Sequence, residues 1–157
     1  MTSRIACIIL FLISIPAFAA GSLELIVPNI ENRQVSMKKT PRLTVIIANV
    51  SEYDEPVVFR EIGVEKKGSD GKFQNVRVDV QCDYCNEKCN IDPTKLKRGE
   101  SRIGVWDYRQ KDCSTATSGT YRFVVVARYS EAVGGYVYHG VSKEFTLTDY
   151  VEHLQRR

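Results

Sequence analysis

The sequence predicts an all-β protein, and two observations support this fold class. Apolar residues recur with period two or in short β-branched runs, which is the pattern of half-buried or central strands. Glycine, proline, asparagine and aspartate interrupt these runs about every 8 to 15 positions, a spacing typical of sandwiches and barrels. We therefore expect consecutive strands joined by turns.

The N-terminus has the organisation of a secretory signal peptide. The cation Arg4 precedes an apolar run over residues 5–15 and an Ala-Phe-Ala sequence at 17–19, the order of regions that defines such signals. The run is shorter than the ~20 residues that a membrane helix needs. We expect a signal peptide over residues 1–19 and a single domain over residues 20–157. We expect that domain to have no membrane span and to reside in the periplasm or outside the cell.

Three strands and a tight turn are predicted in the first half of the chain. Leu23–Val27 ends at Pro28, and Leu43–Val50 is apolar almost throughout, as expected of a central strand. Val57–Lys66 follows, and the next five residues, Lys-Gly-Ser-Asp-Gly, have the composition of a hairpin turn.

The second half begins with Phe73–Gln81, in which three valines alternate against Arg77 and Asp79, so one face is expected to be exposed to solvent. Three further strands are predicted over Ser101–Trp106, Tyr121–Tyr129 and Tyr136–Leu147.

The chain end carries Asp149 and, three residues later, Glu152, a capping-box spacing that predicts a short C-terminal helix over 149–156. Seven to eight strands in about 138 residues favour an immunoglobulin-like Greek-key β-sandwich.

Four cysteines remain after signal removal, Cys82, Cys85, Cys89 and Cys113. An even number in an exported chain predicts disulfides, and the spacing suggests that one of the three clustered cysteines pairs with Cys113. Two alternatives stay open, since four sulfurs also suit a zinc ion or an iron–sulfur cluster and Cys82-x-x-Cys85 could be a redox pair.

Composition argues against several functional classes. Without Arg4 the chain has 21 basic and 19 acidic residues, a net charge of +2, with both signs interspersed, which gives no reason to expect nucleic acid. The two histidines, His139 and His153, have no serine or cysteine at a recognised catalytic spacing. We therefore expect neither an enzyme nor a cofactor.

Aromatic residues divide into structural and candidate binding positions. Tyr121 follows Ser-Gly-Thr and precedes an apolar strand, which predicts a tyrosine corner, while Trp106 ends a strand and is assigned to the structure. Because tyrosine is enriched in protein interfaces, the candidate binding residues are Tyr84, Tyr129, Tyr136 and Tyr138.

Three short motifs occur in order along the chain: Leu96-x-x-Gly-Glu-Ser101, Trp106-Asp107 and Ser118-Gly-Thr-Tyr121. With the Asn-Val-Ser that ends the strand at 43–50, this arrangement resembles small exported immunoglobulin-like modules. These include BsuPI-type proteinase-inhibitor domains and the β-rich pro-regions of secreted metalloproteases. The resemblance covers about residues 40–147 and implies a sandwich fold and a possible inhibitory role, although the cysteine loop departs from the inhibitor pattern.

The leading hypothesis is an exported, non-enzymatic module that binds another protein, with inhibition of a hydrolase or proteinase as one form of that binding. The surfaces expected to bind are the cysteine loop 82–94 and the hairpin tip 130–138, because a disulfide-pinned loop loses less entropy on binding. One alternative is a metal-binding or thiol-exchange protein that uses the cysteines, and another is a structural subunit of an envelope or surface assembly.

Overall fold

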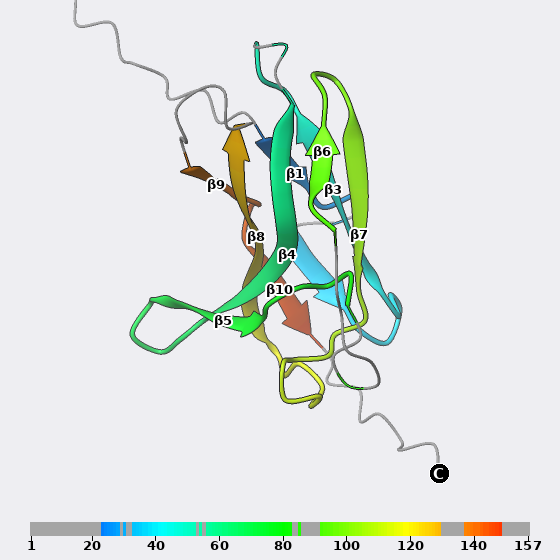
Figure 1. The fold of residues 1–157 in the computed structure, drawn as a ribbon. Helices are drawn as coiled ribbons and strands as arrows, with labels where there is room; N and C mark the ends of the chain where they lie inside the picture. Colours follow the sequence, from blue (N-terminus) through cyan, green and yellow to red (C-terminus); the bar gives the residue numbers. More distant parts are fainter. Residues whose placement is uncertain are drawn as a thin grey trace, which may run out of the picture.

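The computed structural model describes residues 23–28, 30, 33–52, 54, 56–82, 85, 92–129 and 137–148, with the backbone alone at 129, 137 and 138. Within these ranges ten strands form two sheets and there is no α-helix (Figure 1), so the all-β prediction is confirmed. Nothing in the described ranges has the helical length and apolarity of a membrane span. The predicted signal peptide and the helix predicted over 149–156 lie outside them.

The smaller sheet has the order β1 (Leu23–Ile26), β3 (Leu43–Asn49), β7 (Ser101–Trp106), and its strands pair antiparallel. Side chains along β3 alternate between buried and half-buried, so one face of this strand packs into the core. Its central position confirms what its apolar sequence predicts, because a strand with a neighbour on each side exposes little surface.

The larger sheet has β4 (Val57–Lys67) and β8 (Gly119–Tyr129) side by side at its centre (Figure 1). On one side of this pair lie β10 (Phe145–Thr148) and β2 (Gln34–Ser36), which pair in parallel. On the other side lies β5 (Phe73–Arg77). Two more strands complete the sheet: β6 (Thr94–Leu96) pairs with β4, and β9 (Val137–Val141) pairs with β8.

The sequence patterns missed two short strands, β2 and β6, and joined two strands that are separate. The strand predicted over 136–147 is β9 and β10, interrupted at Ser142. There the Ser142 hydroxyl accepts a hydrogen bond from the Phe123 N–H at 2.9 Å. A side chain thus takes the place of a backbone acceptor, and the regular ladder stops.

The core lies between the two sheets and is centred on Trp106, which is fully buried. Its ring contacts Tyr121 and Phe123 of the larger sheet at centroid distances of 5.5 and 6.2 Å. Tyr108 packs edge-on at 5.3 Å and donates a hydrogen bond from its hydroxyl to the Thr40 carbonyl at 2.7 Å. Burial raises the pKa of Tyr108 to about 12, because the phenolate is poorly solvated there.

The exposed face predicted for strand 73–81 is wrong. Arg77 is 2% exposed and Asp79 is 1% exposed, and the strand ends at Arg77. The guanidinium of Arg77 donates to the Asp79 carbonyl at 3.0 Å, to the Gln110 carbonyl at 3.3 Å and to the Cys82 carbonyl. A buried cation is tolerated because it is hydrogen-bonded to several acceptors, so Arg77 holds three chain segments together.

Asp79 and Asn49 are likewise buried polar residues that connect segments. The Asp79 carboxylate accepts from the backbone N–H groups of Ile62 and Gln81 at 3.2 and 3.0 Å. At the end of β3, the Asn49 amide donates to the Leu96 carbonyl at 2.9 Å, and its oxygen accepts from the Ser51 N–H at 3.0 Å. Both side chains therefore replace missing backbone partners where strands end.

Candidate functional site

The two residues assigned to the structure lie in the core. Trp106 is fully buried, and its indole N–H donates to the Arg109 carbonyl at 2.9 Å. Tyr121 is also fully buried, near the start of β8, and its hydroxyl donates to the Thr117 carbonyl at 2.6 Å. That bond has the geometry of a tyrosine corner. Desolvation is the main cause of the raised pKa of Tyr121.

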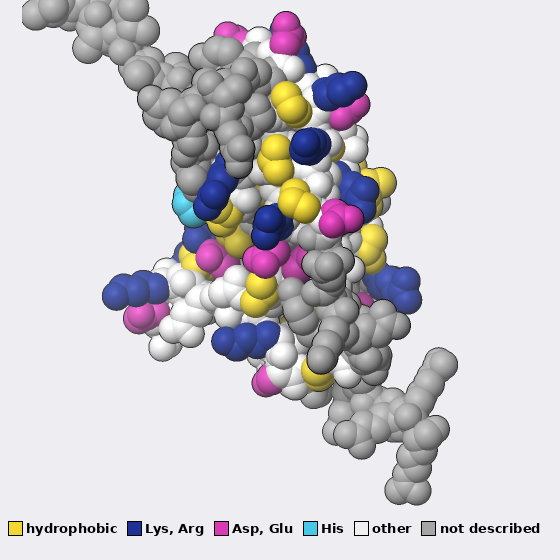
Figure 2. Space-filling model, in the orientation of Figure 1, with side chains coloured by type: hydrophobic (Ala, Val, Ile, Leu, Met, Phe, Trp, Pro, Cys, Tyr) yellow, Lys and Arg dark blue, Asp and Glu magenta, His cyan; other side chains and the backbone are white. Residues whose placement is uncertain are grey.

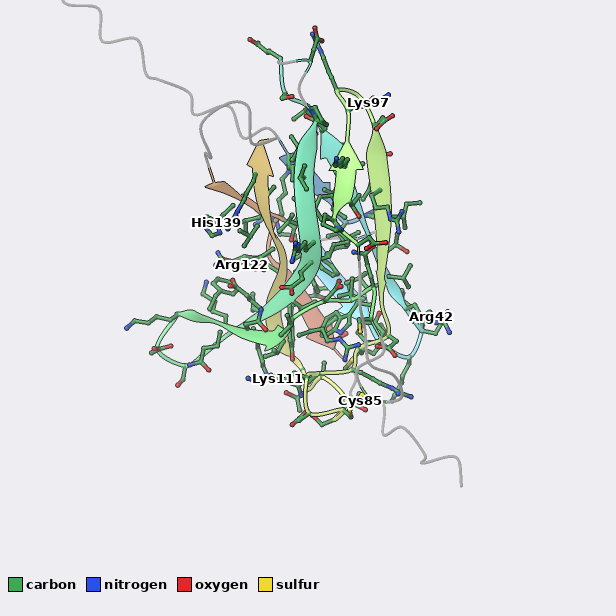
Figure 3. All side chains as sticks on the ribbon, viewed as in Figure 1. Arg42, Cys85, Lys97, Lys111, Arg122 and His139 are labelled. Carbon is green, nitrogen blue, oxygen red and sulfur yellow. A yellow bond between two sulfur atoms is a disulfide. The ribbon has the colours of Figure 1, made fainter. Side chains whose placement is uncertain are left out.

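The cysteine region lies at one end of the molecule. Cys85 is bonded to Cys113, 28 residues further on, with their Cα atoms 5.7 Å apart, and Figure 3 shows Cys85 and Lys111 at that end. Cys82 is buried and also disulfide-bonded, while Cys89 lies outside the described residues. The Cys85–Cys113 bond is consistent with the disulfide prediction, in which one of the three clustered cysteines pairs with Cys113.

The candidate binding tyrosines are not placed by the structure. Tyr84 and Tyr136 lie outside the described residues, and the side chains of Tyr129 and Tyr138 are not described. Most of the cysteine loop 82–94 and of the hairpin tip 130–138 also lies outside them. His139 is exposed on β9, and no group of three or more His, Cys, Asp or Glu side chains in the described ranges could hold a metal ion.

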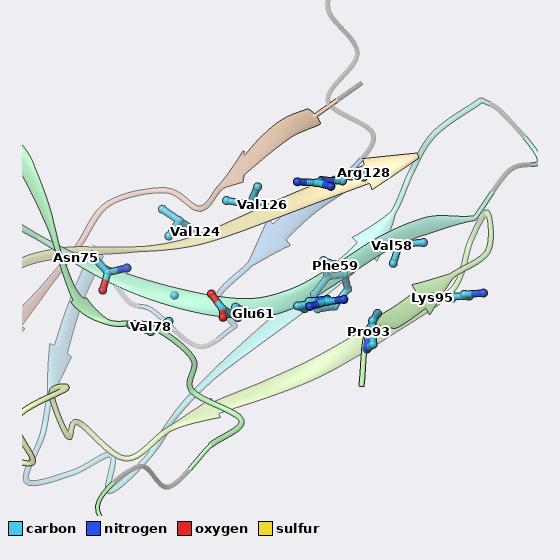
Figure 4. Close-up of a pocket in the computed structure, with 12 residues that line it drawn as sticks. Val58, Phe59, Glu61, Asn75, Val78, Pro93, Lys95, Val124, Val126 and Arg128 are labelled. Carbon is cyan, nitrogen blue, oxygen red and sulfur yellow. The ribbon is translucent and has the colours of Figure 1, made fainter. Parts of the chain in front are cut away.

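A groove of about 850 Å³ runs along the outer face of the larger sheet (Figure 4). Its floor is apolar, formed by valines of β4 and β8 and by Val78, which follows β5. Val126 is 50% exposed and Val78 is 38% exposed. Charged and polar side chains surround the floor: Arg60, Glu61, Asn75, Lys95 and Arg128. On this face, Figure 2 shows apolar side chains interspersed with basic ones.

A β-bulge in β4 places two adjacent charges on the groove side. Phe59 pairs with Ala127 and Ile62 pairs with Val125, so Arg60 and Glu61 together lie opposite the single residue Val126. Both are exposed although they are neighbours in the chain. A regular strand would direct one of them into the core, whereas a bulge redirects side chains in this way.

The cations gather at one end of the groove. Val58 pairs with Arg128 of β8 on one side and with Lys95 of β6 on the other, so these three side chains form one row across the sheet. The row of Arg60 is two residues further along β4, a distance of about 6.6 Å. This end of the groove therefore has three positive charges around an apolar residue.

At the other end of the sheet face, the cation is neutralised by an ion pair. Arg122 of β8 forms an ion pair with Glu65 of β4, with a nitrogen–oxygen distance of 2.7 Å, and its guanidinium lies 3.8 Å from the centre of the Phe73 ring. Between this pair and the cationic end, Val124 lies opposite Gly63 and pairs on its other side with Val141 of β9, which is 45% exposed. The sheet face thus changes from cationic to apolar to neutral along β8.

Sequence comparisons find no match to any family model and no similar curated protein. Several solved structures overlap the chain, and two of them are the following. One, described as the ApaA protein from Bordetella pertussis, is 13% identical with a TM-score of 0.41, covering 80% of this chain and 90% of that one. The other, a structural-genomics target named SoR45, is 15% identical with a TM-score of 0.41, covering 87% of this chain and 97% of that one. Both likenesses are too distant to transfer fold or function.

The described residues of the groove lining offer apolar, cationic and hydrogen-bonding groups. Its apolar floor can desolvate apolar side chains, its cations can pair with carboxylates, and Asn75 can both donate and accept hydrogen bonds. Glu61 is the single carboxylate in the lining, and His139, which pairs with Val126 across the sheet, is exposed. These properties suit recognition of another molecule.

Apart from Pro93, which belongs to the predicted binding loop 82–94, the sequence patterns did not predict the residues of this groove, although two signals for it were present. The adjacent charges Arg60 and Glu61 interrupt the alternation of strand 57–66, which is how a bulge appears in a sequence. Side chains of a strand alternate between its two faces, so the three consecutive valines at 124–126 put apolar residues on both faces of the sheet. When one face packs on the core, the other face exposes a valine.

Proposed function

We propose that this chain is an exported, non-enzymatic module that binds another protein through the groove on the larger sheet. The observation that carries the proposal is the coincidence of an exposed apolar floor with a charged rim on one sheet face. Exposed apolar surface with polar surroundings is characteristic of interaction sites, and charged rims orient partners.

We also propose that the two sheets form an immunoglobulin-like Greek-key sandwich. The order β1-β3-β7 corresponds to the A, B and E strands of that fold, and β10-β8-β4 corresponds to G, F and C. The hydrogen bond from Tyr121 near the start of β8 supports the assignment, because a tyrosine corner occupies the start of strand F.

Export is supported by two features of different origin. The first 19 residues have the pattern of a signal peptide, and Cys85–Cys113 is a disulfide, a bond that persists in oxidising compartments such as the periplasm or the extracellular space. Together with the resemblance to BsuPI-type modules, a periplasmic or secreted location makes inhibition of a hydrolase the first form of binding to test.

A structural subunit of an envelope assembly is the second candidate, and the smaller sheet favours it. Ile26, Ile46 and Ile103 are paired in register on β1, β3 and β7, which forms an apolar row across the outer face. Ile103 is 60% exposed. A module in an assembly would use this second face as well as the groove.

Site-specific photo-crosslinking in the native cells separates these possibilities. A benzoyl-phenylalanine at position 126 reports on the groove, and the same residue at position 103 reports on the opposite face. The proposal predicts a discrete protein adduct at 126 that is missing at 103. Adducts at both 126 and 103 would favour the assembly subunit, adducts at 103 alone would refute binding through the groove, and no adduct at either position would refute binding through the sheet faces.

A further inference from the structure

The three cations at the groove end lie close together and have no carboxylate partner, unlike four cations elsewhere in the described part of the chain. Lys67, Arg98, Arg109 and Arg122 each lie within 4 Å of a carboxylate. Arg60, Lys95 and Arg128 have no such partner in the described part of the chain. With Glu61 as the one acidic residue of the lining, the groove has a net charge of +2, and the charge complementary to it is negative.

The cations and the valines occupy successive rows along the strands. Arg128 and Lys95 flank Val58 in the first row, and Arg60 lies in the next row beside Val126. Val124 and Val141 form the third row. Rows on one face are about 6.6 Å apart, which equals the separation of residues i and i+2 in an extended peptide.

From this arrangement we propose that the groove binds an extended segment of a partner protein in which acidic residues are followed by apolar ones. Carboxylates at i and i+2 reach the first and second rows, and apolar side chains at i+4 and beyond cover Val124 and Val141. This inference rests on the proposed function, since it specifies the partner of the same groove.

A peptide fits the lining better than an anionic lipid surface. Glu61 lies among the cations and would repel a layer of phosphate headgroups, whereas a peptide offers backbone N–H groups to that carboxylate. Asn75 can bond to both the N–H and the C=O of a peptide backbone. The apolar residues form the floor of a recess rather than a protruding loop, so a flat membrane would not contact them.

The test uses selection from a display library of random twelve-residue peptides on the folded, oxidised protein. Three variants are compared. The charge variant is Arg60→Gln/Lys95→Gln/Arg128→Gln, and the floor variant is Val124→Asn/Val141→Asn, which changes the two valines of the third row. The control is Arg42→Gln/Lys72→Gln/Arg102→Gln, which removes the same charge from exposed positions outside the groove lining. All substituted side chains are at least partly exposed, so folding is retained, which unfolding curves verify.

We expect selected peptides to carry Asp or Glu two residues apart, followed by Val, Ile or Leu. In fluorescence anisotropy, the affinity of the best peptide should fall about tenfold in the charge variant and about tenfold in the floor variant. It should change less than twofold in the control. Raising the salt concentration should weaken binding to the wild type more than to the charge variant.

Selected peptides without acidic residues that still require Val124 and Val141 would overturn the inference while leaving the groove as a binding site. Binding to phosphatidylglycerol vesicles in place of peptides, or a dimer in sedimentation that the floor variant dissociates, would overturn it in favour of a lipid or of a second copy. The inference would also be overturned if selection on the wild-type protein enriched no peptides beyond those enriched on the floor variant. The crosslinking at position 126 then decides separately whether the proposed function fails as well.

Discussion

Arg77 provides the sharpest test of how this fold is held together. Its guanidinium donates to the carbonyls of Asp79, Gln110 and Cys82, and it is almost completely buried. Arg77→Met keeps the apolar stem but leaves three acceptors without this donor. A hydrogen bond from a charged group contributes ~1.5 kcal/mol at the low end, so losing three of them costs about 4.5 kcal/mol of a free energy of unfolding of ~5–15 kcal/mol.

The assay is urea unfolding followed by the fluorescence of Trp106, which is the only tryptophan of the chain and lies in the core. Arg77→Lys should lose about half as much, because one ammonium group cannot reach all three carbonyls. Arg102→Met, an exposed arginine on β7, is the matched control and should change stability by less than ~0.5 kcal/mol. A loss below about 1 kcal/mol for Arg77→Met would show that the carbonyls find other partners and that Arg77 is not a structural link.

Three further measurements follow from the structure. Replacing Cys85 and Cys113 by serine should cost about 3.5 kcal/mol in urea unfolding, because the unfolded chain is freed from a loop of 28 residues; a change below ~1 kcal/mol would contradict this. The pKa of Tyr108 is near 10 in the unfolded chain and about 12 in the folded protein. The contribution of Tyr108 to the free energy of unfolding is therefore complete below pH 10 and declines as the pH rises to 12. The wild type should lose about 2 to 3 kcal/mol in that range that Tyr108→Phe does not lose, and parallel pH profiles for the two proteins would refute the argument. Asn49→Ala should cost about 2 kcal/mol in the same unfolding assay, since the Leu96 carbonyl and the Ser51 N–H lose their partners, and an unchanged midpoint would mean that water replaces the amide.

The strands that the sequence predicts well are those whose apolar pattern reflects burial against one core. Leu43–Asn49 and Ser101–Trp106 match their predictions to within one residue, because alternation and burial agree along them. β2 and β6 have three residues each, too few for any period to be detected. They exist because longer strands beside them supply the hydrogen-bond partners.

The errors at strand 73–81 have a different cause. Arg77 and Asp79 are charged residues whose burial depends on carbonyl and N–H groups far away in the sequence, such as Gln110 and Ile62. No local pattern contains that information. The groove escaped prediction for a related reason: Arg60, Lys95 and Arg128 meet only because β4, β6 and β8 pair in a particular register.

The bulge in β4 adds one residue to the strand without changing which side chains of the strand face the core. Phe59 before it and Ile62 after it both face inward, although two residues rather than one lie between them. Deleting Glu61 would restore regular pairing and leave both side chains in place, while the described lining of the groove would lose its one carboxylate. A single-residue insertion or deletion at the bulge therefore changes the charge of the binding surface and leaves the packing of the core unchanged. We expect related chains with the same core to differ at this position and to bind different partners.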